Sequence, residues 1–146
     1  MTTSTDFDAM SWHDNAVHAI RIVESEGGVG ELVLDIDFIV EWLPPDNGAF
    51  AFRIAPSDLV FHEVSNLVVS INYAAMPAAV QPMIIHEIQR EPVRYANGHG
   101  SFVWRIEGSW PPSALLTFEA SGFTQTVRSP PKVSGAQYLP ASERAA

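Results

Sequence analysis

Three of the five histidines fall in rows of alternating apolar residues, and this placement suggests metal chemistry. His18, His62 and His86 each share parity with isoleucines or valines two residues away. If these rows line one interior, the three imidazoles converge, as in zinc or iron sites that keep an open coordination position. His13 and Asp14 would add an imidazole and a carboxylate oxygen. We predict no cofactor unless these side chains converge, and a divalent metal if they do.

The same residues also have a structural interpretation. Asp14 and Asn15, next to a predicted strand start, can bond the backbone and fix a turn, and Trp12 would cover the core. Each histidine could then pack with one satisfied hydrogen bond. The chain has no cysteine and no G-x-S-x-G motif, which excludes thiolate sites and argues against a serine hydrolase. The sequence favours a non-enzymatic protein.

Four carboxylates form an acidic stripe on a predicted strand at residues 31–42. The stripe consists of Glu31, Asp35, Asp37 and Glu41. Such a row of like charges on an exposed face gains most from a basic partner. Trp110, in a predicted turn, is expected to be exposed and to add an aromatic contact. The alternative is a solvated face that protects an edge strand from aggregation.

The elements that must position these residues are β-strands. Apolar and polar residues alternate in eight or nine short runs, separated by turn signals at roughly 8–12-residue spacing. No segment has the three-and-four spacing of an amphipathic helix. We predict an all-β fold with little or no helix: a single-domain antiparallel β-sandwich or open barrel over residues 1–128. Residues 129–146, rich in Pro, Ser, Gly and Ala, are predicted to form an extended tail.

The composition limits the partners. The 146 residues fit one domain, and 17 acidic against 8 basic side chains give a net charge of −9. This charge repels phosphate backbones and anionic lipids, so we expect no nucleic acid and no membrane partner, and a basic protein fits better. Residues 1–10 lack the features of a signal peptide. The lack of cysteine is compatible with a reducing compartment, and by default we expect a cytoplasmic protein.

Two segments resemble known families. The stretch Trp12–His18 resembles the opening of several uncharacterised bacterial β-rich families, in which an aromatic-His-Asp signature leads into the first strand. Some of these look like immunity proteins of polymorphic toxin systems. The run Leu116–Gln125 also resembles a signature of a small domain family of unknown function. The immunity likeness implies a cytoplasmic protein that binds and neutralises a partner protein.

The leading hypothesis is therefore a non-enzymatic domain that docks a protein partner through its acidic stripe. Two alternatives stay open. One is a metal- or small-ligand-binding β-sandwich that uses the His/Asp site. The other is an assembly unit whose open sheet edges pair into a homodimer.

Overall fold

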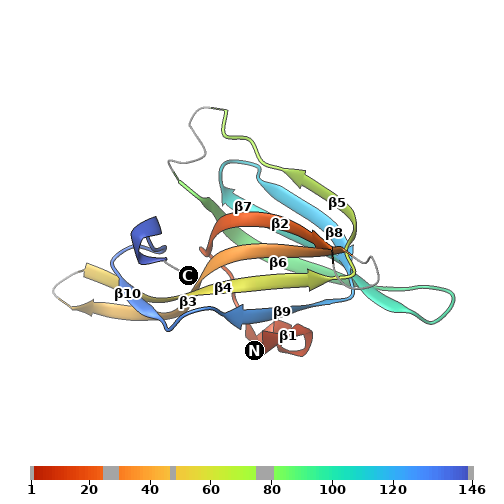
Figure 1. Cartoon of the computed structure of the whole chain (residues 1–146), viewed down its shortest axis with the longest axis horizontal. Helices are drawn as coiled ribbons and strands as arrows, with labels where there is room; N and C mark the ends of the chain where they lie inside the picture. Colours follow the sequence, from red (N-terminus) through yellow and green to blue (C-terminus); the bar gives the residue numbers. More distant parts are fainter. Residues whose placement is uncertain (1, 25–29, 47–48, 75–80, 145–146) are drawn as a thin grey trace.

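A computed structural model describes residues 2–24, 30–46, 49–74 and 81–144 (Figure 1). The strands are β1 (Thr2–Thr3), β2 (Ala16–Glu24), β3 (Gly30–Asp46), β4 (Ala49–His62), β5 (Ser65–Ser70), β6 (Met83–Arg94), β7 (Gly100–Trp110), β8 (Leu115–Ala120), β9 (Gly122–Val127) and β10 (Lys132–Ser134). Two short 3-10 helices, η1 (Ser4–Ala9) and η4 (Ala141–Glu143), are the helical elements of these ranges. The predicted all-β class is confirmed. None of the described helices is long and apolar enough to cross a membrane.

All the described strands belong to one antiparallel sheet, which they do not close into a barrel. The order is β1-β9-β4-β3-β2-β6-β7-β8-β5, and β10 pairs with β4. Two halves of the sheet meet where Ala16 and Val17 of β2 pair with Ile84 and Met83 of β6. The chain returns from one half to the other between β8 and β9, and both halves enclose a common core (Figure 1). The architecture lies between a sandwich and an open barrel.

Apolar side chains from both halves fill the main core. The even-numbered residues of the row 32–36 on β3 are at most 1% exposed, as the period-two pattern predicts. Trp104 of β7 is fully buried. The N-terminal segment closes one end of the core: the Phe7 ring lies 5.6 Å from the Trp104 ring, and Trp12 Nε1 donates to Gln125 Oε1 at 2.8 Å. Trp12 therefore covers the core, as expected.

Strand β4 is continuous through Pro56-Ser57-Asp58, although a proline ordinarily interrupts a strand. Pro56 pairs with Asp37 of β3, and its carbonyl oxygen accepts the main-chain N–H of Arg128 at 2.8 Å. The N and O atoms of one residue in a strand point to the same side, so the missing N–H of Pro56 points away from β3. On that side the neighbour of β4 changes from β10 to β9. The proline is tolerated because it falls at this junction.

The C-terminal segment folds back over the outer face of β3 and β4. Strand β10 pairs with residues 52–54 of β4, and Leu139 is fully buried beside Ile39. Ile39 alternates with the core-facing residues of β3, so this second apolar cluster lies on the face opposite the main core. The predicted tail at 129–146 therefore covers, with its described residues up to 144, a face expected to be wet.

Candidate functional site

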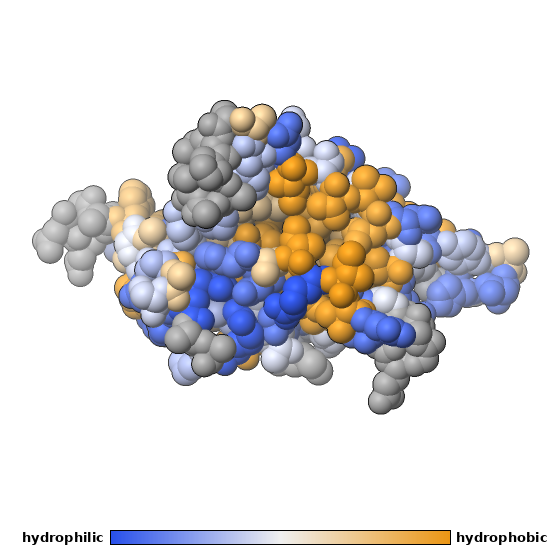
Figure 2. Space-filling view, turned by 45° about the horizontal axis from the view of Figure 1, so that its top comes forward, coloured by the Kyte–Doolittle hydropathy of each residue, from blue (hydrophilic) through white to orange (hydrophobic). Residues whose placement is uncertain are grey.

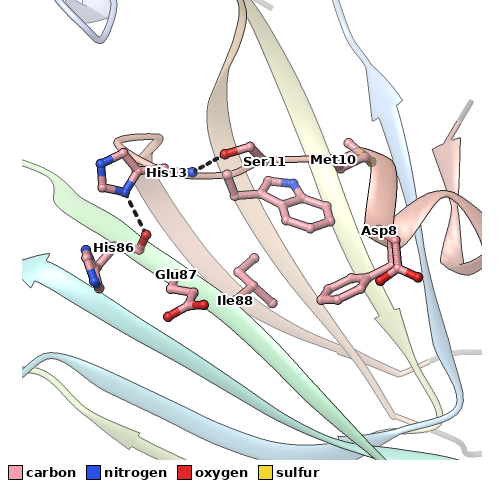
Figure 3. A pocket seen from close by; sticks show the side chains of 9 residues that line it. Asp8, Met10, Ser11, His13, His86, Glu87 and Ile88 are labelled. Atoms are coloured by element: carbon pink, nitrogen blue, oxygen red, sulfur yellow. Dashed lines mark hydrogen bonds between the residues drawn. The ribbon is translucent and has the colours of Figure 1, made fainter.

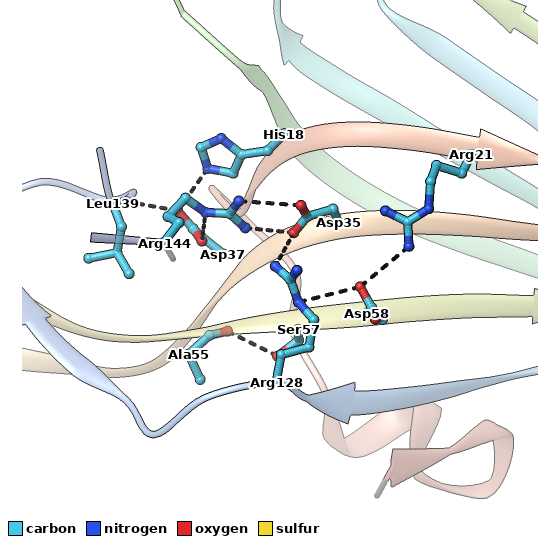
Figure 4. A network of polar contacts seen from close by, with 10 residues as sticks. All are labelled: His18, Arg21, Asp35, Asp37, Ala55, Ser57, Asp58, Arg128, Leu139 and Arg144. Carbon is cyan, nitrogen blue, oxygen red and sulfur yellow. Dashed lines mark hydrogen bonds and ion pairs between the residues drawn. The ribbon is translucent and has the colours of Figure 1, made fainter. Parts of the chain in front are cut away.

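The middle of the acidic stripe is buried. Asp37 is 0% exposed and Asp35 is 8% exposed, because the C-terminal segment covers them (Figure 4). The Asp37 carboxylate accepts hydrogen bonds from His18 Nε2 at 2.8 Å, Leu139 N–H at 2.7 Å and Arg144 Nε at 2.8 Å. We call the contact of Arg144 with Asp35 and Asp37 the C-terminal latch. The structure thus corrects the expectation of four exposed acids in a row.

Two guanidinium groups hold Asp35. Arg144 binds it with both Nη atoms, at 3.3 and 2.6 Å, and Arg128 Nη2 donates to it at 2.6 Å. Arg128 Nε also lies 3.5 Å from Asp58 Oδ1, and Arg21 Nη2 lies 4.0 Å from the same oxygen. Buried carboxylates require this degree of pairing. The network is therefore a structural device that fixes the C-terminal segment, and its acids are not free to dock a partner.

Lowering the pH should weaken this network of ion pairs. Burial raises the pKa of Asp37, but the hydrogen bonds from His18, Leu139 and Arg144 outweigh burial and hold the pKa below its ordinary value of 3.8. A carboxyl with a lowered pKa contributes stability above its unfolded pKa, and that stability is lost as pH falls through the folded pKa. We expect the free energy of unfolding, measured in urea, to decline below about pH 4. Asp37→Asn should flatten this decline, and an unchanged acid limb in that variant would contradict the prediction.

The other predicted docking residues do not form one surface. Glu31 accepts a hydrogen bond from His62 Nδ1 at 2.6 Å, and the exposed Glu41 pairs with Arg53 Nε at 3.3 Å. Trp110 is only partly exposed, and its buried indole N–H has no hydrogen-bond partner among the described residues. It lies on β7, in the other half of the sheet. The five docking residues are therefore not joined in one exposed patch.

Two of the predicted metal ligands lie far apart. His18 is the extra residue of a bulge in β2, and its ring turns to Asp37 on the outer face. His62 binds Glu31 on β3. Asp37 and Glu31 are six residues apart on that strand, which separates the two sites by about 20 Å. The expected convergence of His18 and His62 with His86 in one interior is wrong, because the bulge shifts the parity of β2 and His62 lies outside the core.

The other three predicted ligands do come together, beside a cavity of about 440 Å³ (Figure 3). His13 and His86 line this cavity, and their rings are 5.4 Å apart between centroids. His13 Nδ1 donates a hydrogen bond to the main-chain oxygen of His86 at 2.8 Å. The His13 Nε2 atom lies 3.5 Å from Asp14 Oδ2. His13 therefore fixes the backbone of β6 where His86 projects.

A β-bulge explains why His86 and Glu87 project side by side (Figure 3). Ile85 pairs with Gly108 and Glu87 pairs with Glu107, which leaves His86 as an extra residue in β6. A bulge re-aims the side chain of its extra residue, so two neighbours share a face that regular alternation would separate. The possible ligand atoms of His86, Glu87 and Glu107 lie within 4.8 Å of one another.

Glu87 and Glu107 are not among the residues that the sequence predicts as ligands. A period of two places residues 86 and 87 on opposite faces, and nothing in the alternation aligns either acid with a histidine. One signal was available: Gly108 interrupts a strand pattern, and a glycine at such a place often marks a bulge.

A third feature is an opening in the sheet between β2 and β5. Beyond Val17, β2 pairs only with β3, and β5 pairs only with β8, within the described ranges. Ile22 pairs with the buried Leu32 and yet is 75% exposed; Val69 pairs with the buried Leu116 and is 44% exposed. Core-facing side chains are exposed here because none of the described strands covers them. The β2–β5 opening is defined by Ile20, Ile22, Val69 and Ile71.

Figure 2 shows this region as a continuous apolar patch beside a hydrophilic area.

No protein-family model, curated protein or solved structure matches the chain. The likeness to immunity proteins stays a prediction.

Proposed function

We propose that this chain is a non-enzymatic protein-binding domain that accepts an extended segment of a partner protein in the β2–β5 opening. The observation that carries the proposal is the exposure of Ile22 and Val69, whose cross-strand partners are buried. A strand added to an open sheet edge gains main-chain hydrogen bonds, and pockets for alternate side chains give it specificity. The opening supplies both features.

Two kinds of interaction support binding there. The edges of β2 and β5 that no described strand pairs present main-chain N–H and C=O groups that a partner strand can pair. Ile20 and Ile71 line a cavity of about 240 Å³ that can take an apolar side chain. Burying one such side chain contributes about 1.5–3 kcal/mol. The partner segment therefore needs an apolar residue at alternate positions.

The charge of the domain favours a basic partner over a second copy. Two copies would each bring a net charge of −9 to the contact, and like charges facing each other across an interface oppose association. Glu24, at the end of β2, and Glu63, just before β5, are exposed acids at the margin of the opening. They would attract lysine or arginine residues of the partner. In this proposal the latch acids, Asp35 and Asp37, take no part in docking.

A displayed library of random extended peptides tests the proposal. We expect the enriched peptides to alternate apolar residues, to carry lysine or arginine, and to bind less tightly as the salt concentration rises. Ile22→Lys should weaken their binding by roughly tenfold or more, since an apolar contact worth about 1.5–3 kcal/mol is lost. Hydrogen exchange of the complex should show new protection on β2 and β5.

Val133→Lys is the matched control, because Val133 is 58% exposed on β10, away from the opening. Both lysine variants should keep the wild-type denaturation midpoint, as exposed substitutions usually do. Unchanged peptide binding by Ile22→Lys, or protection on other strands, would refute the opening as the site. A salt-independent affinity would refute the basic partner. A dimer seen by light scattering and abolished by Ile22→Lys would replace the partner with a second copy.

A further inference from the structure

Beyond protein binding, the geometry points to a divalent transition-metal site formed by His86, Glu87 and Glu107, beside the cavity lined by His13 and His86. The three side chains come from two paired strands, β6 and β7. Their possible ligand atoms, one imidazole nitrogen and two carboxylate oxygens, lie within 4.8 Å of one another. This site differs from the one expected from the sequence, with which it shares only His86.

The charge arrangement favours a cation here. Glu87 and Glu107 stand directly opposite each other on β6 and β7, and like charges in this position are destabilising. The Arg105 Nε atom, 2.8 Å from Glu107 Oε1, offsets one of these carboxylates. No ion pair involves Glu87 within the described ranges. A bound cation would relieve the remaining repulsion and be shared by both acids.

The distances suit an ion after small side-chain movements. Ligand atoms bound tetrahedrally to one zinc ion at about 2.0–2.2 Å lie about 3.3–3.6 Å apart, closer than the 4.8 Å limit found here. His86 and Glu87 are exposed, so their side chains can rotate between staggered conformers to close the difference. The backbone needs no movement, because the bulge already directs both side chains to one side.

The ligand types define the class of metal. Calcium and magnesium take oxygen ligands, whereas an imidazole with carboxylates suits zinc and its first-row neighbours. Three protein ligands leave at least one coordination position for water or an anionic group. Among the other histidines, His18 and His62 are each engaged by a carboxylate, and the chain has no cysteine. Few residues outside this cluster could therefore account for metal binding by this protein.

Titration of the tag-free full chain with Zn²⁺, followed by calorimetry, tests the site. We expect one saturable site with micromolar affinity, and weaker binding of Ca²⁺ and Mg²⁺. His86→Ala should weaken Zn²⁺ binding by about tenfold or more, since even outer-shell partners of a metal are worth about that factor. Glu107→Gln should also weaken it, although the imidazole remains. Added Mn²⁺ should broaden NMR signals centred on residues 86, 87 and 107.

His99→Ala is the matched control, because His99 is an exposed histidine in the turn between β6 and β7, outside the cluster. It should bind Zn²⁺ like the wild type. His86 is also exposed, so both alanine variants should keep the wild-type thermal midpoint. The inference is overturned by the absence of saturable binding, by equal losses in the His86 and His99 variants, by equal affinity for Ca²⁺, or by Mn²⁺ broadening centred on His13 and Asp14.

Discussion

Replacing Arg144 with alanine is expected to lower the free energy of unfolding by about 3–5 kcal/mol, the usual cost of removing one partner from a buried ion pair. The Arg144 side chain is 9% exposed and bonds Asp37, whose side chain is 0% exposed. Without the guanidinium, the Asp37 charge stays buried with only His18 and a main-chain N–H to compensate it. Asp35 keeps Arg128, so the loss falls mainly on Asp37.

Arg53→Ala is the control for this prediction. Arg53 pairs with Glu41 on the surface, and the two side chains are 42% and 56% exposed. Exposed pairs contribute about 0–1 kcal/mol, so this variant should unfold close to the wild-type urea concentration. Tryptophan fluorescence can follow both transitions. Equal losses in the two variants would show that the latch is no stronger than a surface pair.

The C-terminal latch is a contact that the alternation of residues along β3 does not predict. Alternation along β3 predicts which residues enter the core, and Leu32, Leu34 and Ile36 are buried as expected. The same alternation predicts a wet face for Asp35 and Asp37, because a period of two separates faces and cannot say what covers each one. The residues that cover this face, Leu139 and Arg144, are 102 to 109 positions away in sequence from the acids that they contact.

The positions of β-bulges are a second feature that alternation does not predict, and they decide where two of the histidines lie. His18 and His86 are each the extra residue of a bulge, in β2 and in β6. One extra residue shifts the alternation at that point of the strand, so His18 and His86 leave the core-facing rows to which the sequence assigns them, and Glu87 shares a face with His86 instead. Bulges depend on the fit between strands that are distant in sequence, which alternation within one strand does not contain. For the edges of β2 and β5, the sequence predicts only that open sheet edges are able to pair, without saying which strands carry them.

Trp104→Ala is expected to lower the free energy of unfolding by about 3–5 kcal/mol, through a cavity in the core. Trp104 is 0% exposed, and its Nε1 donates to the main-chain oxygen of Ala120 at 3.1 Å. Its ring contacts residues from both halves of the sheet: the centroids of Phe61, on β4, and Phe102, on β7, lie 5.0 and 5.8 Å away. Because Trp104 joins the two halves, urea denaturation should remain a single transition at a lower midpoint.

Trp42→Ala is the matched substitution on the outer face. Trp42 is 52% exposed and has a ring contact with Phe52 at 4.7 Å between centroids. An aromatic pair of this kind contributes about 0.5–1.5 kcal/mol, so its loss should be well below that of Trp104→Ala. Similar losses in both variants would contradict the larger contribution expected of the buried Trp104 side chain.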